Sequence, residues 1–147
     1  MPVNNSIPPP LEQNVPALAF NETHPLKVLV VDDSPALRER LIEMLSQVTG
    51  LKVVGEAESV ADAQRAIEEL KPGLVVLDLQ LRDGSGLEVL REAKRVQPNI
   101  KLVVFTNQPE LQYRQRCADL GADYFLCKST DAKALLAIGE VLVSESN

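Results

Sequence analysis

Two adjacent carboxylates, Asp32 and Asp33, directly follow the apolar run VLVV. Like charges side by side repel each other and neither gains anything from a hydrophobic core, so the pair is expected to bind something. Three further reactive side chains stand at the ends of later apolar runs, namely the carboxylate of Asp78, the hydroxyl of Thr106 and the amine of Lys128. These residue types suit divalent-cation binding and phosphoryl transfer.

Each side chain in this set has a role that its type allows. Three carboxylates cannot share a small space without a cation, and their hard oxygens suit Mg²⁺, which needs few protein ligands. Asp78 could accept a phosphoryl group covalently, with Mg²⁺ offsetting the charge that approaches it. Lys128 offers a point cation and Thr106 a hydroxyl donor to phosphoryl oxygens. The single histidine and the two scattered cysteines, interpreted as reduced, offer no competing zinc site.

The elements that must position these residues are indicated by alternating apolar runs and helical periods. Continuous apolar runs are typical of strands covered on both faces, and the stretches between them space apolar residues as helices do. Five strand–helix alternations predict an α/β protein with a five-stranded parallel sheet and helices on both faces. Ligands of such sheets bind beyond the carboxyl ends of the strands, where the five side chains would meet. The predicted strands cover residues 27–31, 51–57, 74–78, 100–106 and 123–128, and the fourth helix covers residues 109–120.

Local signals give three finer expectations. Ser59 to Asp62 resembles a capping box at a helix start. Val96 continues the apolar period of the third helix and is expected to face inward. Arg38 is interpreted as part of a solvated helix face. The ordinary alternative for Asp32 and Asp33 is a solvated acidic helix entry, because acids favour a helix N-terminus.

Composition limits the function classes. The chain has 147 residues, 45% of them hydrophobic, which suffices for one compact domain. A net charge of −6, no tryptophan and 3% aromatic residues argue against direct nucleic-acid binding. No apolar run approaches the roughly 18 residues of a membrane span, and no basic start marks a secretion signal, so a cytoplasmic location without membrane contact is expected. Residues 1–25, rich in proline, are predicted to be a flexible tail before a domain at residues 26–147.

The segments VLVVDDSP, LVVLDLQLRDGSG, VVFT and GADYFLCKS resemble the receiver domain of two-component response regulators, over Lys27 to about Val143. The resemblance implies a flavodoxin-like (βα)5 fold with strand order 2-1-3-4-5. It also implies that Asp78 accepts phosphate from a sensor histidine kinase or a His phosphotransfer protein. Phe125 matches the family's switch aromatic, which would act together with Thr106; its ordinary alternative is a core residue.

The same resemblance implies a set of ligands for Mg²⁺ and for the phosphoryl group. Asp33, Asp78 and the backbone carbonyl of Gln80 would bind Mg²⁺ directly, and Asp32 would act through water. Thr106 and Lys128 would hold the phosphoryl group. The chain would then catalyse only its own phosphorylation and dephosphorylation, and would not be an enzyme in the usual sense.

Departures from the family pattern keep other functions open. Arg82 and Ser129 stand where proline is usual, and Asn107 stands where a small residue is usual. The main expectation is a stand-alone phosphoacceptor switch that controls a protein partner, with a weak homodimer through the last helices left open. One alternative is a phosphorylation-independent adaptor. Another is the receiver part of a truncated DNA-binding regulator, less favoured because the sequence ends at Asn147.

Overall fold

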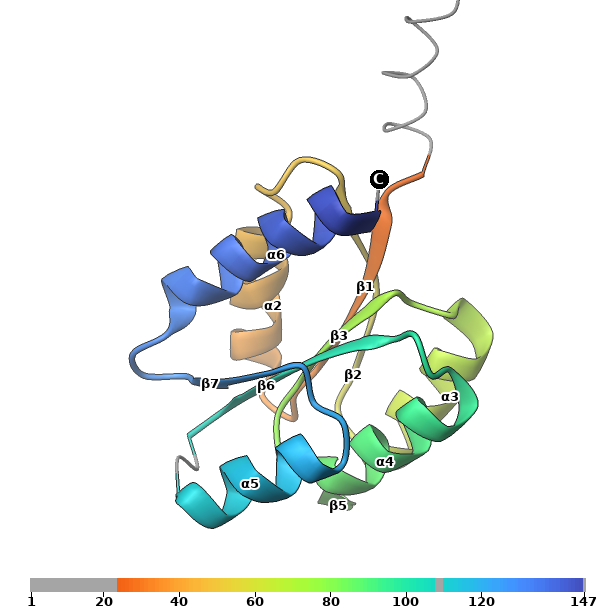
Figure 1. Ribbon diagram of the computed structural model, residues 1–147, viewed down its shortest axis with the longest axis vertical. Helices are drawn as coiled ribbons and strands as arrows, with labels where there is room; N and C mark the ends of the chain where they lie inside the picture. The colour runs from red at the N-terminus through yellow and green to blue at the C-terminus, as the bar shows by residue number, and fades with distance from the viewer. Residues whose placement is uncertain (1–23, 108–109, 147) are drawn as a thin grey trace, which may run out of the picture.

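The computed structural model describes residues 24–107 and 110–146, in which strands and helices alternate along the chain (Figure 1). Five strands form one parallel sheet in the order β2-β1-β3-β6-β7, which is the predicted order 2-1-3-4-5 of a flavodoxin-like fold. The strands are β1 (Leu26–Val31), β2 (Leu51–Ala57), β3 (Leu74–Leu77), β6 (Lys101–Thr106) and β7 (Tyr124–Cys127). The helices are α2 (Pro35–Leu45), α3 (Val60–Leu70), α4 (Gly86–Val96), α5 (Leu111–Asp119) and α6 (Ala132–Ser146).

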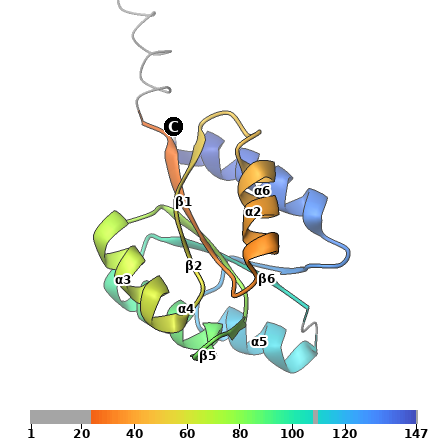
Figure 2. The ribbon, with the colours of Figure 1, turned by 180° about the vertical axis from the view of Figure 1, so that it is seen from behind.

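Two hydrophobic cores lie on opposite faces of the sheet, because successive strand residues point to opposite sides. Leu29 and Val31 of β1 face the core that α3, α4 and α5 cover, whereas Val28 and Val30 face the core under α2 and α6. The ribbon shows the same two layers from the front and from behind (Figures 1 and 2). Burial on both faces explains why the strands are continuous apolar runs in the sequence.

Serine side chains begin three of the helices. Ser34 and Ser59 accept hydrogen bonds from backbone N–H groups at the starts of α2 and α3. The full capping box occurs at α4 instead, where the Ser85 side chain caps the helix and Glu88 accepts from the Ser85 N–H. The expected capping box at α3 is therefore only half formed, since Asp62 supplies its backbone N–H to Ser59.

Some boundaries and exposures differ from the sequence-based expectation. The fourth predicted helix is shorter, since α5 starts at Leu111 and residues 108–109 lie outside the described part of the chain. The expectation for Val96 was wrong: the side chain is 45% exposed, because this last residue of α4 lines the groove beside α3. The loop before α4 holds an unpredicted two-stranded antiparallel pair, β4 (Gln80–Leu81) and β5 (Gly84–Ser85).

One prediction concerns the N-terminal residues. The flexible tail predicted for residues 1–25 lies almost wholly outside the described residues, so it stays a prediction.

Both cysteines are free thiols: Cys117 is buried in the core, where burial raises its pKa to about 11, and Cys127 is half-buried. Within residues 24–107 and 110–146, no helix is long and apolar enough to cross a bilayer.

Candidate functional site

The residues singled out in the sequence converge at one edge of the sheet. Asp32 and Asp78 directly follow β1 and β3, which pair in parallel with Val31 opposite Leu77. Thr106 ends β6 opposite Cys127 of β7, and Lys128 follows immediately. The strand ends are bonded to each other, since Asp78 N donates to Val31 O at 3.0 Å and Lys128 N donates to Thr106 O at 2.9 Å. The predicted convergence at the carboxyl edge is confirmed.

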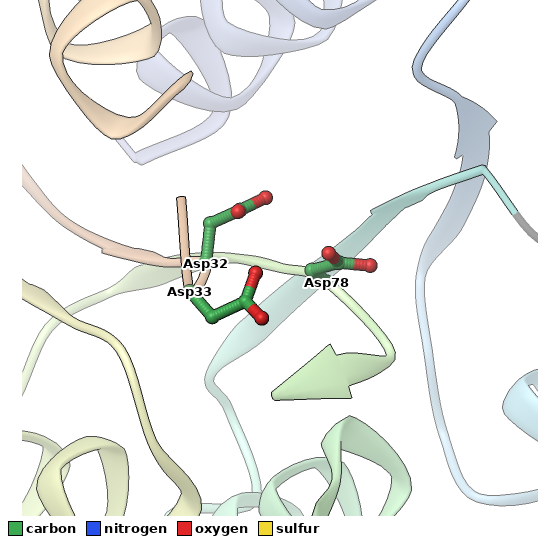
Figure 3. Close-up of side chains that lie close together, drawn as sticks. All are labelled: Asp32, Asp33 and Asp78. Atoms are coloured by element: carbon green, nitrogen blue, oxygen red, sulfur yellow. The ribbon is translucent and has the colours of Figure 1, made fainter. Parts of the chain in front are cut away.

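An acidic cluster forms at this edge, where one carboxylate oxygen each from Asp32, Asp33 and Asp78 lies within 4.8 Å of the others. Figure 3 shows these carboxylates side by side where β1 and β3 end. Asp33 is exposed, whereas Asp32 is 1% and Asp78 5% exposed. Hard oxygen ligands at this spacing, with one side open to water, fit Mg²⁺, which keeps several waters when bound by proteins.

The amine of Lys128 neutralises part of this cluster. Its Nζ donates to Asp78 Oδ2 at 2.7 Å and lies 2.7 Å from Asp32 Oδ2. Burial alone disfavours the charged amine, but the hydrogen bonds to Asp32 and Asp78 outweigh it and raise the pKa of Lys128 above its ordinary value. One cation therefore bridges two buried carboxylates.

Asp32 is held from several sides. Its Oδ1 accepts from the Ser34 N–H at 2.9 Å, and its main-chain carbonyl accepts from an Arg38 guanidinium nitrogen at 2.7 Å. Burial raises the pKa of Asp32 above its ordinary value, and the hydrogen bonds from Lys128 and Ser34 offset this only in part. The interpretation of Arg38 as a solvated residue was wrong, since its side chain is 14% exposed and also pairs with Glu56 at 2.8 Å.

The loop after Asp78 turns back tightly toward it. Gln80 N donates to Asp78 Oδ1 at 3.3 Å, and Gly86 N donates to Leu79 O at 2.8 Å. A Cβ at Gly86 would lie 2.2 Å from Asp78 O, so only glycine allows this approach. Gln80 is thus fixed two residues beyond Asp78, in the loop where the family resemblance implied a backbone ligand.

Thr106 and Phe125 are the two residues with a predicted switch role. Thr106 is fully buried at the end of β6. Phe125, on β7, is half-buried and packs against the core under α3, α4 and α5. The guanidinium carbon of Arg114 on α5 lies 4.7 Å from the centroid of the Phe125 ring, a cation–π contact. Sequence reasoning did not find this pair, because the two residues come from different elements.

A doubly wound α/β sheet with an acidic cluster and a bridging lysine at its carboxyl edge places these side chains where proteins of this fold class bind their ligands. The model of the response regulator receiver domain matches residues 28–139. The chain therefore belongs to the response regulator receiver family, as the sequence motifs predicted.

Curated relatives and solved structures agree with this assignment. The chain is 39% identical over 108 residues to the response regulator protein VraR of Staphylococcus saprophyticus, covering 74% of this chain and 52% of the relative. It is 36% identical over 121 residues to the response regulator GacA of Pseudomonas aeruginosa, covering 82% of this chain and 56% of the relative. A CheY-like receiver domain protein from Methanospirillum hungatei superposes with a TM-score of 0.75 at 25% identity, covering 82% and 95% of the two chains.

The chain spans about half the length of these curated relatives. The likeness therefore concerns the receiver part that this sequence and its relatives share. What the remaining half of each relative does is a property of that relative.

Proposed function

We propose that the chain is a phosphoacceptor switch that works in the cytoplasm and takes a phosphoryl group on Asp78 from a sensor histidine kinase or a His phosphotransfer protein. The observation that carries the proposal is the Lys128 amine, 2.7 Å from carboxylates of both Asp32 and Asp78 inside a cluster that fits Mg²⁺. Such a site concentrates negative oxygens and compensates them only in part. This charge arrangement supports the proposal that the site receives a divalent cation and a phosphoryl group together.

In the proposed transfer, one Asp78 oxygen forms a bond to phosphorus while the bond from phosphorus to the donor's imidazole nitrogen breaks. The electron pair of the breaking bond goes to that nitrogen. Mg²⁺, when held by Asp33, Asp78 and the Gln80 carbonyl, would offset the charge on the phosphoryl oxygens. Lys128 sits within reach of Asp78 and would pair with one of those oxygens, and the buried Thr106 hydroxyl would bind another.

The proposed output is a change in the face formed by α5, β7 and α6. Lys128 directly follows β7, and Thr106 ends β6 opposite Cys127 of β7, so drawing both residues toward the aspartyl phosphate would bias the conformation of this face. Phe125 lies on the same strand, β7, and is half-buried, and its ring is proposed to repack when the strand ends move. The downstream partner is proposed to be a protein that reads this face.

Acetyl phosphate with Mg²⁺ tests the proposal, because it offers a phosphoryl group without a kinase. Intact-mass spectrometry is expected to show one added phosphoryl group in the wild type and none in Asp78→Asn. If the wild type gains no phosphoryl group from acetyl phosphate or from any histidine kinase, or if Asp78→Asn gains it equally, the proposal is wrong. The phosphorylation-independent adaptor would then be favoured.

A second candidate is a role in transcription through a DNA-binding output domain. It is favoured by a relative described as a putative transcriptional regulator of Pseudomonas aeruginosa, 33% identical over 118 residues, of which the chain covers 56%. An immunoblot of the endogenous protein tests it. A band near 16.1 kDa, the mass of this chain, supports a separate receiver, and a band about twice as heavy supports a covalent output domain.

A further inference from the structure

The loop that follows the acceptor is tied to a helix that carries none of the predicted site residues. Asp83, in the turn between β4 and β5, accepts from the Val60 N–H through Oδ1 at 2.6 Å and from the Ala61 N–H through Oδ2 at 3.3 Å. Its neighbour Arg82 forms an ion pair with Glu58, and Arg82 N donates to Glu58 O at 3.4 Å. We call these contacts, made by Arg82 and Asp83 with residues 58, 60 and 61, the acceptor clasp.

The acceptor clasp completes the start of α3. The first N–H groups of a helix have no partner within the helix and need one from outside. The Ser59 side chain accepts from the Asp62 N–H at 3.1 Å. The Asp83 carboxylate accepts from the N–H groups of Val60 and Ala61, which lie 23 and 22 positions away in the sequence. A carboxylate at this place also interacts well with the positive end of the helix dipole. The hydrogen bond from Val60 is the main reason why the pKa of Asp83 is lowered.

The same clasp holds the turn of the loop that surrounds the acceptor. On one side of the turn, Gln80 and Leu81 follow Asp78 and pair with Gly84 and Ser85 on the other side. Gln80 N donates to Asp78 Oδ1, and Leu81 is buried in the same core as Val60. The hydrogen bond from Gly86 N to Leu79 O closes the base of the loop. The acceptor clasp fixes the opposite end of the loop, at the turn.

We propose that Asp83 is a positioning residue for the Mg²⁺ site: by anchoring the β4–β5 turn to α3, it sets the place of Gln80 beside Asp78. This inference rests on the proposed function, since it concerns the same metal site. Mg²⁺ binding and the start of α3 are then coupled, and the coupling is reciprocal. Disrupting the clasp weakens Mg²⁺ binding, and binding Mg²⁺ strengthens the hydrogen bonds that α3 donates to Asp83.

A purely structural role for Asp83, as a helix cap and nothing more, makes a different prediction. Ser59 provides the matched control, because it caps the same helix through one hydrogen bond but belongs to the segment before α3 and not to the acceptor loop. Ser59→Ala and Asp83→Ala both remove capping interactions from α3. Only Asp83→Ala frees the turn that connects β4, the strand with Gln80, to β5.

The experiment measures Mg²⁺ affinity by titration calorimetry in the full chain without phosphorylation. Asp83→Ala is expected to weaken binding by about fivefold or more, and Ser59→Ala by less than about twofold. Asp83→Asn keeps an oxygen acceptor for one N–H and is expected to fall between the wild type and Asp83→Ala; it also serves if the alanine variant does not fold. Equal losses in Asp83→Ala and Ser59→Ala, or unchanged affinity in both Asp83 variants, would overturn the inference.

Amide hydrogen exchange supplies a second readout. In the wild type, Mg²⁺ is expected to slow exchange at the Val60 and Ala61 amides, and in Asp83→Ala this slowing is expected to vanish. Mg²⁺-independent exchange at these amides in the wild type counts against the coupling. Failure of the proposed function looks different: the wild type itself would not bind Mg²⁺, or Asp33→Asn would bind it equally well, and the inference would fall with it.

Discussion

Lys128 supplies the positive charge that partly balances the acidic cluster, so its removal should show how much the unbalanced carboxylates lower the free energy of unfolding. Lys128→Met keeps much of the side chain's length but leaves Asp32 and Asp78 without the amine that lies 2.7 Å from each. Removing one partner from a buried ion pair costs about 3–5 kcal/mol, and water around Asp33 reduces this toward about 2 kcal/mol. The free energy of unfolding without Mg²⁺, measured with urea near pH 7, should fall by that amount.

The pH dependence of this loss follows from the pKa shifts. The pKa of Asp32 is raised by burial, so the folded state binds a proton more readily than the unfolded chain and loses stability as pH rises through the folded pKa. Without Lys128 that pKa rises further. The destabilisation by Lys128→Met should therefore shrink as pH falls from about 7 toward 4. A loss that is constant with pH would contradict the role of the amine.

Arg114 is expected to hold the Phe125 ring in its present position. The cation–π contact at 4.7 Å is worth about 0.5–1 kcal/mol at a partly exposed site, which corresponds to a roughly two- to fivefold bias in a two-state equilibrium. Arg114→Gln should shift the ¹⁹F resonance of fluorinated Phe125 toward the position that this resonance takes in the wild type with Mg²⁺ and beryllofluoride, a mimic of the phosphoryl group. Arg116→Gln, on the same helix and exposed, is the control. If both variants leave the resonance in place, Arg114 does not bias the ring.

Among the elements, the start of α4 depends on close contact between backbones. A Cβ at Gly86 would lie 2.2 Å from Asp78 O and 2.9 Å from Leu79 Cα, and backbone cannot move aside as a side-chain tip can. Gly86→Ala should therefore cost about 3 kcal/mol of unfolding free energy, the upper part of the range for overpacking. It should also weaken phosphorylation from acetyl phosphate, because Asp78 must shift.

Gly139 in α6 provides the comparison for Gly86→Ala. Its added Cβ would meet the end of the Leu51 side chain at 3.1 Å, which can yield. Gly139→Ala should change stability by less than about 1 kcal/mol, since the alanine also favours the helix. Equal effects of the two substitutions on urea unfolding would show that the backbone contact at Gly86 is not limiting.

At the scale of the whole molecule, the features that could be predicted from the sequence are those that local residue patterns and the family resemblance indicate. The strands, their order through the resemblance, and the convergence of Asp32, Asp78 and Lys128 follow from apolar runs and from the geometry of parallel sheets. The contacts of Arg38, Asp83 and Arg114 were missed. Each depends on a partner from another element, as with Asp83 and Val60, 23 positions apart, and no local period reports such a pairing.

In the acidic cluster, the proposed function and the stability of the molecule conflict, because the carboxylates that would bind Mg²⁺ repel each other without it. Asp33 adds a third negative group near Asp32 and Asp78, whereas the Lys128 amine contacts the other two. Without Mg²⁺, Asp33→Asn should relieve repulsion worth about 0.5–1 kcal/mol and raise the Tm by a few degrees. This is the trade between function and stability expected where like charges gather for a ligand.

With Mg²⁺ the order of the two melting temperatures should reverse, so that the wild type melts above Asp33→Asn. Under the proposed function, Mg²⁺ at about 100 times its Kd is expected to stabilise the wild type by about 2.7 kcal/mol, because it would bind the folded state alone, whereas Asp33→Asn would lack a ligand and gain little. Thermal unfolding across a Mg²⁺ titration should therefore show the two melting curves crossing, and Glu43→Gln, on the exposed side of α2, should follow the wild type throughout. An Asp33→Asn protein that melts below the wild type even without metal would mean that Asp33 stabilises the fold by itself and that repulsion in the cluster is not what Mg²⁺ relieves.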